Sequence, residues 1–534
     1  MLEVNSSISS DPLLSLTLCF FIPVLFIIIF SFLSNKSQSS PSKTPCPQSY
    51  PIIGNLVGLL RNRHRLHDWV TDMLSQTPSS TFQVRNFLDL SHGVCTANPA
   101  NVDHFLHSNF QNYIKGSRFH DVLSELLGDG IFNVDAPLWT LQRKIASHEF
   151  KTNSLKHFIS DTVASEISTR LIPFLSAASD GDNRVVDLQD VLQRFGFDNI
   201  CHVAFGVNPA CLVSDNMHQN TPSSDFAKAF DDAVEISSSR FLSPLPLLWK
   251  LKRFLNIGSE KRYKEAIEVI SRYAMDIIRS KEQDQEGDQD LLSRFMFSSL
   301  SMEFQDEEHK RKFLRDIVIS FILAGRDTTS TALTWFFWLI SGHPRCTRLI
   351  HAELSAVALA PAKEPRIFSY DELKKLHYLH AALSETMRLF PPLPINSRLT
   401  VDDDVLPDGT RVGKGWFADY SAYAMGRMER VWGEDCREFR PERWLDDDGA
   451  FQPSDQNRFP VFHCGPRICL GKEMAYLQMK SVAAAVMNEF DVVVVDGGAT
   501  AEKMMNPPYT LALLLKMRGG LPVKLIRRRQ LHMC

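Results

Sequence analysis

The sequence has no strong excess of charge of either sign, no internal repeat and no clustered cysteines. Its 534 residues hold 58 Lys and Arg against 62 Asp and Glu, a formal net charge of -4, so a strongly basic nucleic-acid-binding protein is excluded. The missing repeat argues against solenoids and propellers. The ten cysteines form no CxxC pair and no Cys/His group with zinc spacing. Scattered thiols in so large a chain are typical of a reducing compartment, so a special cysteine must be identified by its local context.

Charge is also absent from one long apolar run near the N-terminus. Leu13–Leu33 comprises 21 residues without a charge, and a helix of that length spans roughly 30 Å, the thickness of bilayer hydrocarbon. A cleaved signal peptide is the alternative, but the run is long for its apolar region and no Lys or Arg precedes it. Lys36 and Lys43 follow the run, which favours a cytosolic location for the remainder. We expect a luminal N-terminus at 1–12, a transmembrane anchor at 13–33, a Ser/Pro-rich linker at 34–50 and a globular domain at 51–534.

The globular part is predicted to be one large, mainly helical domain with small β-sheets. Apolar residues recur at spacings of three and four in Val185–Phe195, Ser259–Ser280 and Phe313–Ser341, which indicates helices. Short strands are expected near Thr81–Val84, at Val405–Val412 around a Pro-Asp-Gly turn, and toward the C-terminus. No change of composition marks a second domain, although the length exceeds that of a usual single core.

One cysteine has a local context suited to binding a metal. The segment FPVFHCGPRICLGKEMAYLQMK, residues 459–480, is loop-like as far as Gly471 and helical from Lys472. Cys469 therefore lies just before a helix N-terminus, where free amide groups and the helix dipole favour an anion. This position is expected to lower the pKa of the thiol and to favour the thiolate, the form that ligates metals. Cys464 is interpreted as a small packing residue.

The residues around Cys469 complete a pattern. Gly465 and Gly471 would let the backbone approach a flat cofactor closely, and Arg467 is suited to pairing with a carboxylate of that cofactor. The spacing Phe462-x-x-Gly465-x-Arg467-x-Cys469-x-Gly471 resembles in full the haem-binding loop of the cytochrome P-450 superfamily. The resemblance implies that fold, haem b as cofactor and Cys469 as the iron ligand.

Two further groups of residues resemble parts of the same superfamily. Trp139 and Arg143 lie at positions i and i+4 of a predicted helix and resemble the pair that hydrogen-bonds a haem propionate. Glu385, Arg388 and Arg443 resemble the Glu-Arg-Arg network that braces the core beneath the haem loop, where buried charges need partners. The resemblance gives this network a structural role.

The centre of the apolar segment 313–340 carries AGRDTT. A buried Asp with two Thr is costly if it only packs, and Thr can bend a helix by bonding its backbone. The stretch resembles the superfamily's oxygen-activation motif, which implies that Asp327 relays protons and that Thr328 hydrogen-bonds the activated oxygen. This acid–alcohol pair favours a monooxygenase over two alternatives that remain open, a haem-dependent hydroperoxide isomerase and a haem-binding sensor.

The resemblance also implies partners and a compartment. No flavin- or nucleotide-binding fingerprint occurs, so NADPH would be used indirectly, through a separate NADPH–cytochrome P-450 reductase. The other expected partners are O2, a lipophilic small-molecule substrate and the membrane. The expected location is the endoplasmic reticulum membrane, with a single span and a cytosolic catalytic domain.

Longer stretches resemble plant family ninety-four, relatives of fatty-acid ω-hydroxylases. They are GDGIFNVDAPLWTLQRKIASHEF, FILAGRDTTSTALTWFFWLI, AYAMGRMERVWGEDCREFRPERWLD and GPRICLGKEMAYLQMKS. The resemblance implies hydroxylation at or near the end of an aliphatic chain, with a fatty acid as the first candidate. Jasmonoyl–isoleucine and a steroid side chain (C-26 type) are the alternatives.

The same resemblance points to three substrate-contact segments, Asn112–Phe119, Leu393–Ser397 and Tyr509–Leu514. Within and beside them, Arg118 and Arg398 are candidate partners of a substrate carboxylate, with the haem propionates or solvent as alternatives. Asn396 stands where the family leads us to expect Asp. The candidate substrate residues are Arg118, Leu393, Ile395, Asn396, Leu511 and Leu513.

Overall fold

A computed structural model describes most of the chain beyond the linker. The described residues are 47–50, 53–85, 92–150, 152–180, 184–212, 222–243, 246–283, 290–298, 306–357, 365–495 and 504–528. The predicted luminal segment, the anchor and nearly all of the linker lie outside these ranges. Among the described residues, no helix combines the length and the apolar character needed to cross a membrane.

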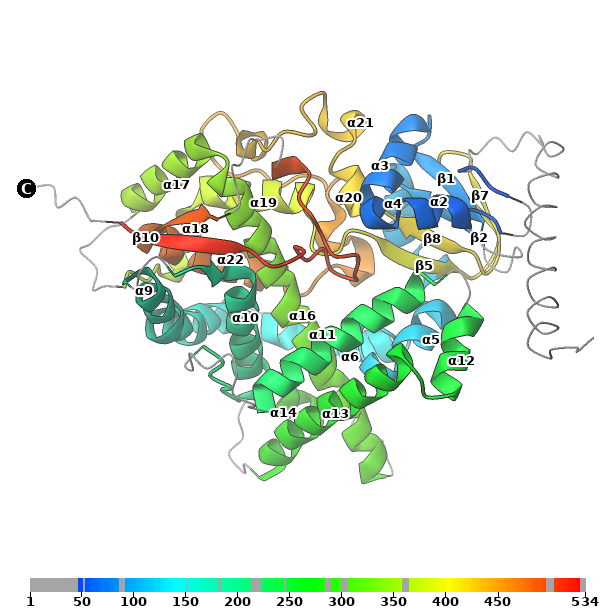
Figure 1. Ribbon diagram of the computed structural model, residues 1–534, viewed down its shortest axis with the longest axis horizontal. Helices are drawn as coiled ribbons and strands as arrows, with labels where there is room; N and C mark the ends of the chain where they lie inside the picture. Colours follow the sequence, from blue (N-terminus) through cyan, green and yellow to red (C-terminus); the bar gives the residue numbers. More distant parts are fainter. Residues whose placement is uncertain are drawn as a thin grey trace, which may run out of the picture.

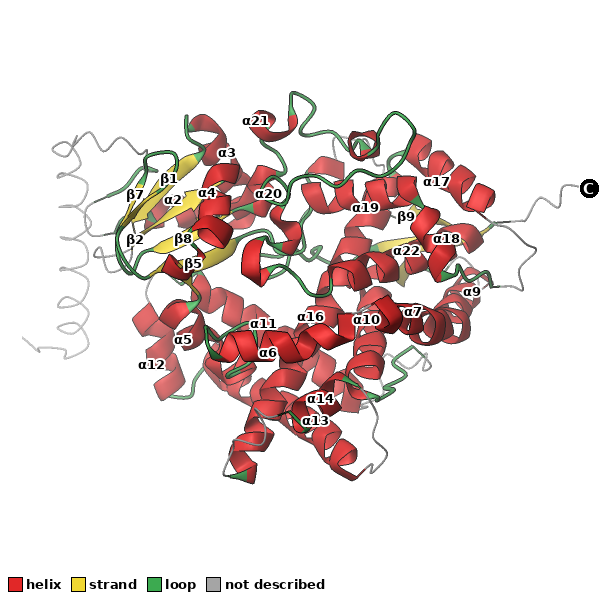
Figure 2. Cartoon of the chain, turned by 180° about the vertical axis from the view of Figure 1, so that it is seen from behind, coloured by secondary structure: helices red, strands yellow, loops and turns green. Residues whose placement is uncertain are grey.

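Helices make up most of the described chain (Figures 1 and 2). The α-helices are α2 (Leu56–Arg61), α3 (Leu66–Gln76), α4 (Pro99–Asp103), α5 (Gly116–Leu127), α6 (Leu138–Ala146), α7 (Thr152–His157), α8 (Ala164–Glu166), α9 (Ile172–Asp180), α10 (Leu188–Phe205), α11 (Pro222–Phe241), α12 (Pro246–Phe254), α13 (Ser259–Gln283), α14 (Leu291–Met296), α16 (Glu307–Ser341), α17 (Pro344–Val357), α18 (Tyr370–Lys375), α19 (His377–Leu389), α20 (Ala422–Met425), α21 (Glu429–Trp432) and α22 (Lys472–Glu489). Short 3-10 or π turns are η1 (Arg63–Arg65), η3 (His104–Ser108), η4 (Phe110–Asn112), η5 (Ser147–Phe150), η6 (Phe158–Val163), η7 (Ile167–Leu171), η8 (Pro441–Trp444), η9 (Pro460–Phe462) and η10 (Gly465–Arg467).

Three small sheets accompany the helices. The largest has the order β1-β2-β8-β5-β3 and is antiparallel except between β2 and β8. A second has the order β4-β10-β9 and lies at the opposite end of the molecule from the first (Figure 1). The third pairs β6 with β7 around the Pro-Asp-Gly turn. The strands are β1 (Thr81–Arg85), β2 (His92–Thr96), β3 (Tyr113–Ile114), β4 (Val186–Asp187), β5 (Asn396–Thr400), β6 (Asp404–Val405), β7 (Arg411–Val412), β8 (Phe417–Tyr420), β9 (Phe490–Val494) and β10 (Pro522–Arg527).

The prediction of a mainly helical protein with small sheets is confirmed, with shifts at helix ends. The helix expected from Val185 begins instead at Leu188, because Val186 pairs in β4 and the Asp187 side chain caps the helix by accepting from the Gln189 amide at 3.0 Å. The helix expected from Phe313 begins at Glu307, where Asp306 is the cap.

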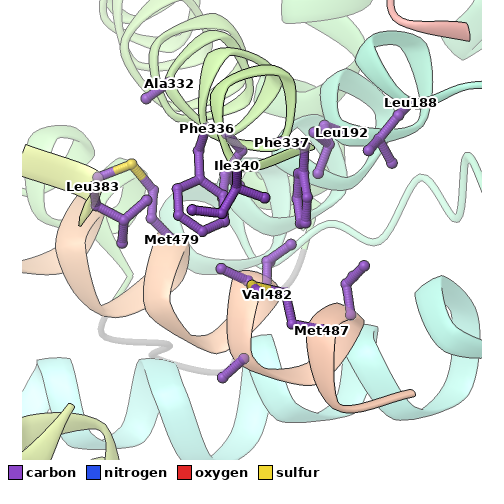
Figure 3. Packing of buried hydrophobic residues seen from close by; sticks show 14 of the residues in the cluster. Leu188, Leu192, Ala332, Phe336, Phe337, Ile340, Leu383, Met479, Val482 and Met487 are labelled. Carbon is purple, nitrogen blue, oxygen red and sulfur yellow. The ribbon is translucent and has the colours of Figure 1, made fainter. Parts of the chain in front are cut away.

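Helix α16 runs through the centre of the protein and joins its two main apolar clusters. Residues 332–340 pack with α10, α19 and α22 in one cluster, where Phe336 and Phe337 lie near Met479 and Val482 (Figure 3). Residues 313–322 pack with α5, α11, α13 and α14 in the other cluster. The polar segment 324–331 lies between the two clusters. The two clusters therefore pack around α16 on either side of segment 324–331, and part of that segment remains accessible.

Candidate active site

The loop before α22 carries Cys469 at the start of that helix. The loop contains two 3-10 turns, η9 and η10, and the Cys469 amide closes it by donating to the Phe462 carbonyl at 2.8 Å. Helix α22 begins at Lys472, as predicted. The side chain of Phe462 packs on Tyr476 of the same helix, with ring centroids 5.3 Å apart. The loop is thus fastened on both sides of the cysteine.

The thiol of Cys469 faces an internal space. Its side chain is exposed, yet burial raises the pKa of the thiol above its usual value. Both observations fit a thiol that has many protein atoms around it while its own surface remains uncovered. The predicted lowering of this pKa is therefore wrong for the chain alone. The Gly471 amide, Arg143 and Lys472 do lower it, but the cost of removing a thiolate from water is larger.

Gly465 has a packing role that the sequence did not indicate. Its φ is +65°, and a Cβ there would lie 1.9 Å from the Leu106 carbonyl oxygen in η3. The glycine therefore lets the loop pack closely on η3. Gly471 has open surroundings, with the nearest atoms of Phe150 and Cys469 3.5 and 4.0 Å from a Cβ.

Cationic side chains from four segments converge beside this loop. Arg467 donates to the Asp135 carboxylate at 2.8 Å and to the Val134 carbonyl at 2.7 Å. Burial, together with Arg398 and Arg143, lowers the pKa of Arg467 to about 10. Burial, together with Arg398 and Arg467, also lowers the pKa of Lys115 well below its usual value. These cations repel one another at a site where Asp135 is the carboxylate that opposes them.

Arg398 is a buried cation of this cluster whose hydrogen-bond donors are only partly paired within the described residues. The side chain is 1% exposed and donates through Nη1 to the carbonyl of neighbouring Ser397 at 2.9 Å. Its Nε and Nη2 have no hydrogen-bond partner among the described residues. His463 lies in the same positive surroundings, since burial followed by Arg398 and Lys115 lowers the pKa of its ring well below the usual value. Buried donors without acceptors are costly, so the cluster is suited to a bound anion.

The pair in α6 borders this cluster. Trp139 is buried, and the Arg143 guanidinium lies 5.8 Å from the centre of its ring. The Arg467 guanidinium lies 4.5 Å from the same ring. The structure thus brings Arg467 to Trp139 and Arg143, from which it is separated by more than 300 residues along the chain.

The middle of α16 presents a partly exposed stripe after the buried run 313–322. Residues 313–322 are all buried, whereas Leu323, Ala324, Gly325 and Thr328 are partly exposed. The helix is continuous through this segment, and the Thr328 hydroxyl donates to the Ala324 carbonyl at 2.7 Å. A Cβ on Gly325 would lie 2.5 Å from Ile200, so this glycine permits close packing of α10 on α16. Ala324 and Thr328, one turn apart, form the open surface.

Asp327 is fully buried and surrounded by long polar contacts. Its Oδ1 accepts from Gln193 at 3.4 Å and lies 3.4 Å from Arg326 and 3.3 Å from the Lys516 ammonium. Its Oδ2 has no hydrogen-bond partner among the described residues. A carboxylate with one loosely held oxygen and one free oxygen is suited to accepting and releasing a proton.

The three residues of the predicted structural network meet in one contact. Arg388 donates to both oxygens of Glu385 at 2.8 Å, and Arg443 donates to Oε1 at 2.9 Å. The Trp444 indole also donates to this carboxylate, at 2.9 Å. Glu385 and Arg388 are fully buried, so every lone pair and proton in the group needs the partner it has.

The candidate substrate residues divide between two neighbouring segments. Leu393, Ile395 and Asn396 are partly exposed, as are Leu511 and Leu513. The Leu515 amide donates to the Pro392 carbonyl at 2.9 Å, which brings the two segments side by side. The two neighbouring segments thus each carry partly exposed apolar side chains.

The two arginines proposed for a carboxylate lie in different surroundings. Arg118 lies with its guanidinium 4.3 Å from the centre of the Phe417 ring and has no partner for Nε among the described residues. It lowers the pKa of Asp419, which burial raises. Arg398 belongs instead to the cluster around Arg467.

Comparisons with known proteins agree with this geometry. The family profile described as Cytochrome P450 matches residues 44–520. The chain is a cytochrome P450. It is 46% identical over 492 residues to cytochrome P450 94A1 of Vicia sativa, covering 90% of each chain. It is 46% identical over 523 residues to cytochrome P450 94A2 of the same plant, covering 94% of this chain and 96% of the other. It is also 46% identical over 464 residues to cytochrome P450 94C1 of Arabidopsis thaliana, covering 87% of this chain and 90% of the other.

The resemblance to plant family ninety-four is therefore confirmed, as are the P450 fold, the monooxygenase class and haem b as the family's cofactor. The residues of this P450 fit that cofactor. An uncovered thiol lies beside buried cations, and two donor atoms of Arg398 have no acceptor within the described part of the chain. The cluster can therefore bind an anion. Haem carries two propionates, which would neutralise such a cluster.

Several residues of the site were not singled out from the sequence. Lys115, Asp135 and His463 join the cation cluster, while Asp231 and Lys516 approach Asp327. His463 lies within the haem-loop motif and could have been considered there. For Lys516 and Asp231, separated by 285 residues, no local pattern signals the contact.

Proposed function

We propose that this P450 hydroxylates a terminal or near-terminal carbon of an aliphatic chain, with a fatty acid as the substrate. The observation that carries the proposal is that two neighbouring segments carry partly exposed apolar side chains, those of Leu393, Ile395, Leu511 and Leu513. We propose that they form an apolar wall beside the haem. An unbranched aliphatic chain would bind to such a wall through the burial of apolar surface alone, without polar partners. Similarity to family ninety-four supports the same choice.

In this proposal Cys469 ligates the haem iron, and Arg143, Trp139, Arg398 and Arg467 bind the propionates. Bound haem supplies the oxygen chemistry, with electron donation from the thiolate, and electrons come from a separate NADPH-dependent reductase. Metal binding offsets the raised pKa of Cys469, since a coordinating thiol is deprotonated.

The proton chemistry belongs to α16. Asp327 takes a proton at its free Oδ2 and passes it toward the Thr328 hydroxyl. That hydroxyl now donates to Ala324 at 2.7 Å and can turn about χ1 to donate into the open space beside it. Glu385, Arg388 and Arg443 hold the surrounding core.

Arg118 is proposed to bind the substrate carboxylate. Its guanidinium is half-buried on the Phe417 ring with Nε free of protein partners among the described residues, so a bound carboxylate restores a charge-assisted hydrogen bond. Replacement by Met keeps the aliphatic length and removes the charge.

The test is a spin-state titration of the haem-loaded enzyme with lauric acid, jasmonoyl–isoleucine and a hydroxylated sterol, followed by product analysis with reductase. We expect lauric acid to give the largest shift and terminally hydroxylated product, and Arg118→Met to raise its Kd about tenfold or more. Arg411→Met is the matched control, because Arg411 is an exposed residue of β7. Preferred turnover of jasmonoyl–isoleucine or the sterol would overturn the fatty-acid assignment. Turnover of a hydroperoxide without reductase or O2 would overturn the hydroxylase itself.

We also propose that residues 13–33 anchor the enzyme in the endoplasmic reticulum membrane, with residues 51–534 in the cytosol. Helix α12 supports a membrane-facing attitude, because Leu247 and Phe254 are 76% and 85% exposed beside Lys250, Lys252 and Arg253. Protease added to sealed microsomes should degrade the catalytic domain and spare an N-terminal tag. A protected catalytic domain would contradict this topology.

A further inference from the structure

One ammonium group lies between a buried and a solvent-facing carboxylate. Lys516 Nζ lies 3.3 Å from Asp327 Oδ1 and donates to Asp231 Oδ1 at 3.1 Å. The side chain of Asp327 is 0% exposed, that of Lys516 is 17% exposed and that of Asp231, on α11, is 44% exposed. The three groups form a continuous polar path from the middle turn of α16 to the surface.

The other groups around Asp327 are held more firmly. Arg326 donates to both oxygens of Asp231, at 2.9 and 3.2 Å, and remains 3.4 Å from Asp327. On α10, Gln193 is neutral, and Asp190 acts on Arg326 while paired with Arg194 at 2.7 Å. Although burial raises the pKa of Asp231, Arg326 and Lys516 together hold it below its usual value. Lys516 is therefore the cation that can exchange between carboxylates while Arg326 stays on Asp231.

The backbone that carries Lys516 is fixed. The Leu513 amide donates to the Ser238 hydroxyl of α11 at 2.8 Å, and the Trp335 indole of α16 donates to the Leu515 carbonyl at 2.6 Å. Movement of the ammonium group thus requires rotation of the lysine side chain alone. The same loop contributes Leu511 and Leu513 to the proposed substrate wall, so the loop that contacts substrate also carries the cation.

We propose that Lys516 is a positioning residue for Asp327. The Lys516 ammonium stabilises the ionised Asp327 carboxylate at rest, and its shift to Asp231 exposes that carboxylate to water arriving along Asp231. Asp327 then takes one proton that this water relays from bulk solvent, the water being reprotonated as it gives its own proton. Asp327 releases one proton toward Thr328, so that it returns to the carboxylate. The inference rests on the proposed proton-relay role of Asp327.

A purely structural lysine would fasten the loop to α11 without changing the protonation of Asp327. The two roles differ in a measurable pH. The haem-loaded full chain is titrated by infrared difference spectroscopy, and the carbonyl band of a protonated carboxyl that is missing in Asp327→Asn is assigned to Asp327. Lys516→Met should raise the midpoint of this band, because the substitution removes the ammonium group that lies 3.3 Å from Oδ1.

Two companion variants test whether the midpoint follows the charges around Asp327. Lys516→Arg keeps the positive charge and should return the midpoint toward the original value. Asp231→Asn removes the competing carboxylate and should lower the midpoint. Lys414→Met, on a loop where the lysine side chain is 72% exposed, is the matched control and should leave it unchanged. Lys516→Gln replaces Lys516→Met if the latter does not incorporate haem.

The infrared and catalytic outcomes separate this inference from the function on which it rests. An unchanged midpoint in the neutral Lys516 variant that incorporates haem would overturn the positioning role. A second readout is product formed per NADPH oxidised, which should fall in Lys516→Met and recover in Lys516→Arg. If Asp327→Asn and Thr328→Ala both keep fully coupled turnover, the proposed relay fails. If those two uncouple and the Lys516 variants do not, only the role of Lys516 fails.

Discussion

Arg388 donates two parallel hydrogen bonds of 2.8 Å to the carboxylate of Glu385, and neither side chain reaches solvent. The remaining donors of Arg388 are satisfied by the carbonyls of Gly426, Cys436 and Glu438. The ion pair lies within α19, and the bonds from Arg388 to these carbonyls tie that helix to the chain that leads toward the haem loop. The loss of Glu385 from this ion pair would leave Arg388 as an uncompensated buried charge, which lowers the free energy of unfolding.

Glu385→Gln should destabilise the fold strongly. The substitution leaves Arg388 buried without its counterion, whereas Arg443 keeps Asp435. Breaking a buried pair costs about 3 to 5 kcal/mol. Equilibrium urea unfolding followed by circular dichroism measures the loss, and haem content should fall with it. Arg440→Gln is the control, because Arg440 reaches Glu385 through its backbone amide while its side chain is 55% exposed. Equal stability of the two variants would contradict the prediction.

Cys469→Ser should abolish the thiolate band of the reduced, carbon-monoxide-bound protein, whereas Cys464→Ser should retain it. Cys464 is 3% exposed, and burial raises the pKa of its thiol to about 12, so it is a packing residue. Cys469 faces the interior space. A thiolate band that survives in Cys469→Ser would remove this residue as the iron ligand.

Gly465→Ala should impair haem incorporation more than Gly471→Ala. An alanine at 465 meets the Leu106 carbonyl in a left-handed backbone conformation that costs about 1 to 3 kcal/mol for a residue with a side chain. At 471 the nearest atom is 3.5 Å away and φ is negative. Haem per chain and the thermal midpoint are the measurements, and a reversed order of the two variants would count against the packing role.

His67 should make the stability fall in mild acid. Burial, assisted by Arg427, lowers the pKa of this ring from 6.5 to about 4, between the rings of Tyr423 and Tyr509. In the unfolded chain, the His67 ring therefore binds a proton below about pH 6.5, whereas in the folded chain it does so only below about pH 4. The free energy of unfolding falls as the pH falls through this window, by up to about 3 kcal/mol.

Substitution of this ring isolates its contribution to the pH dependence. His67→Phe should flatten the profile of the free energy of unfolding between pH 4 and 6.5, while His64→Phe, at an exposed position, should not. Parallel profiles for His67→Phe and the unsubstituted chain would show that the acid sensitivity lies elsewhere.

Local patterns in the sequence were sufficient to predict the long helices and the position of Cys469 at the start of α22. Helical periodicity and loop-breaking residues act over a few positions, so a single sequence carries them. Helix ends were less accurate, because the pairing of Val186 in β4 depends on β10, far along the chain. The reason for Gly465 was also missed, since Leu106 meets it only after folding.

The sequence by itself determined the reaction class, because the haem-loop spacing, the Asp-Thr pair and the three residues of the Glu-Arg-Arg network are read from residue types and short distances along the chain. Only the tertiary structure decided the electrostatics. The pKa of Cys469 rises where the helix terminus alone would lower it, four cations gather against Asp135, and Lys516 bridges Asp327 to Asp231. Desolvation and Coulomb energies depend on separations through space, and those separations exist only once the chain has folded.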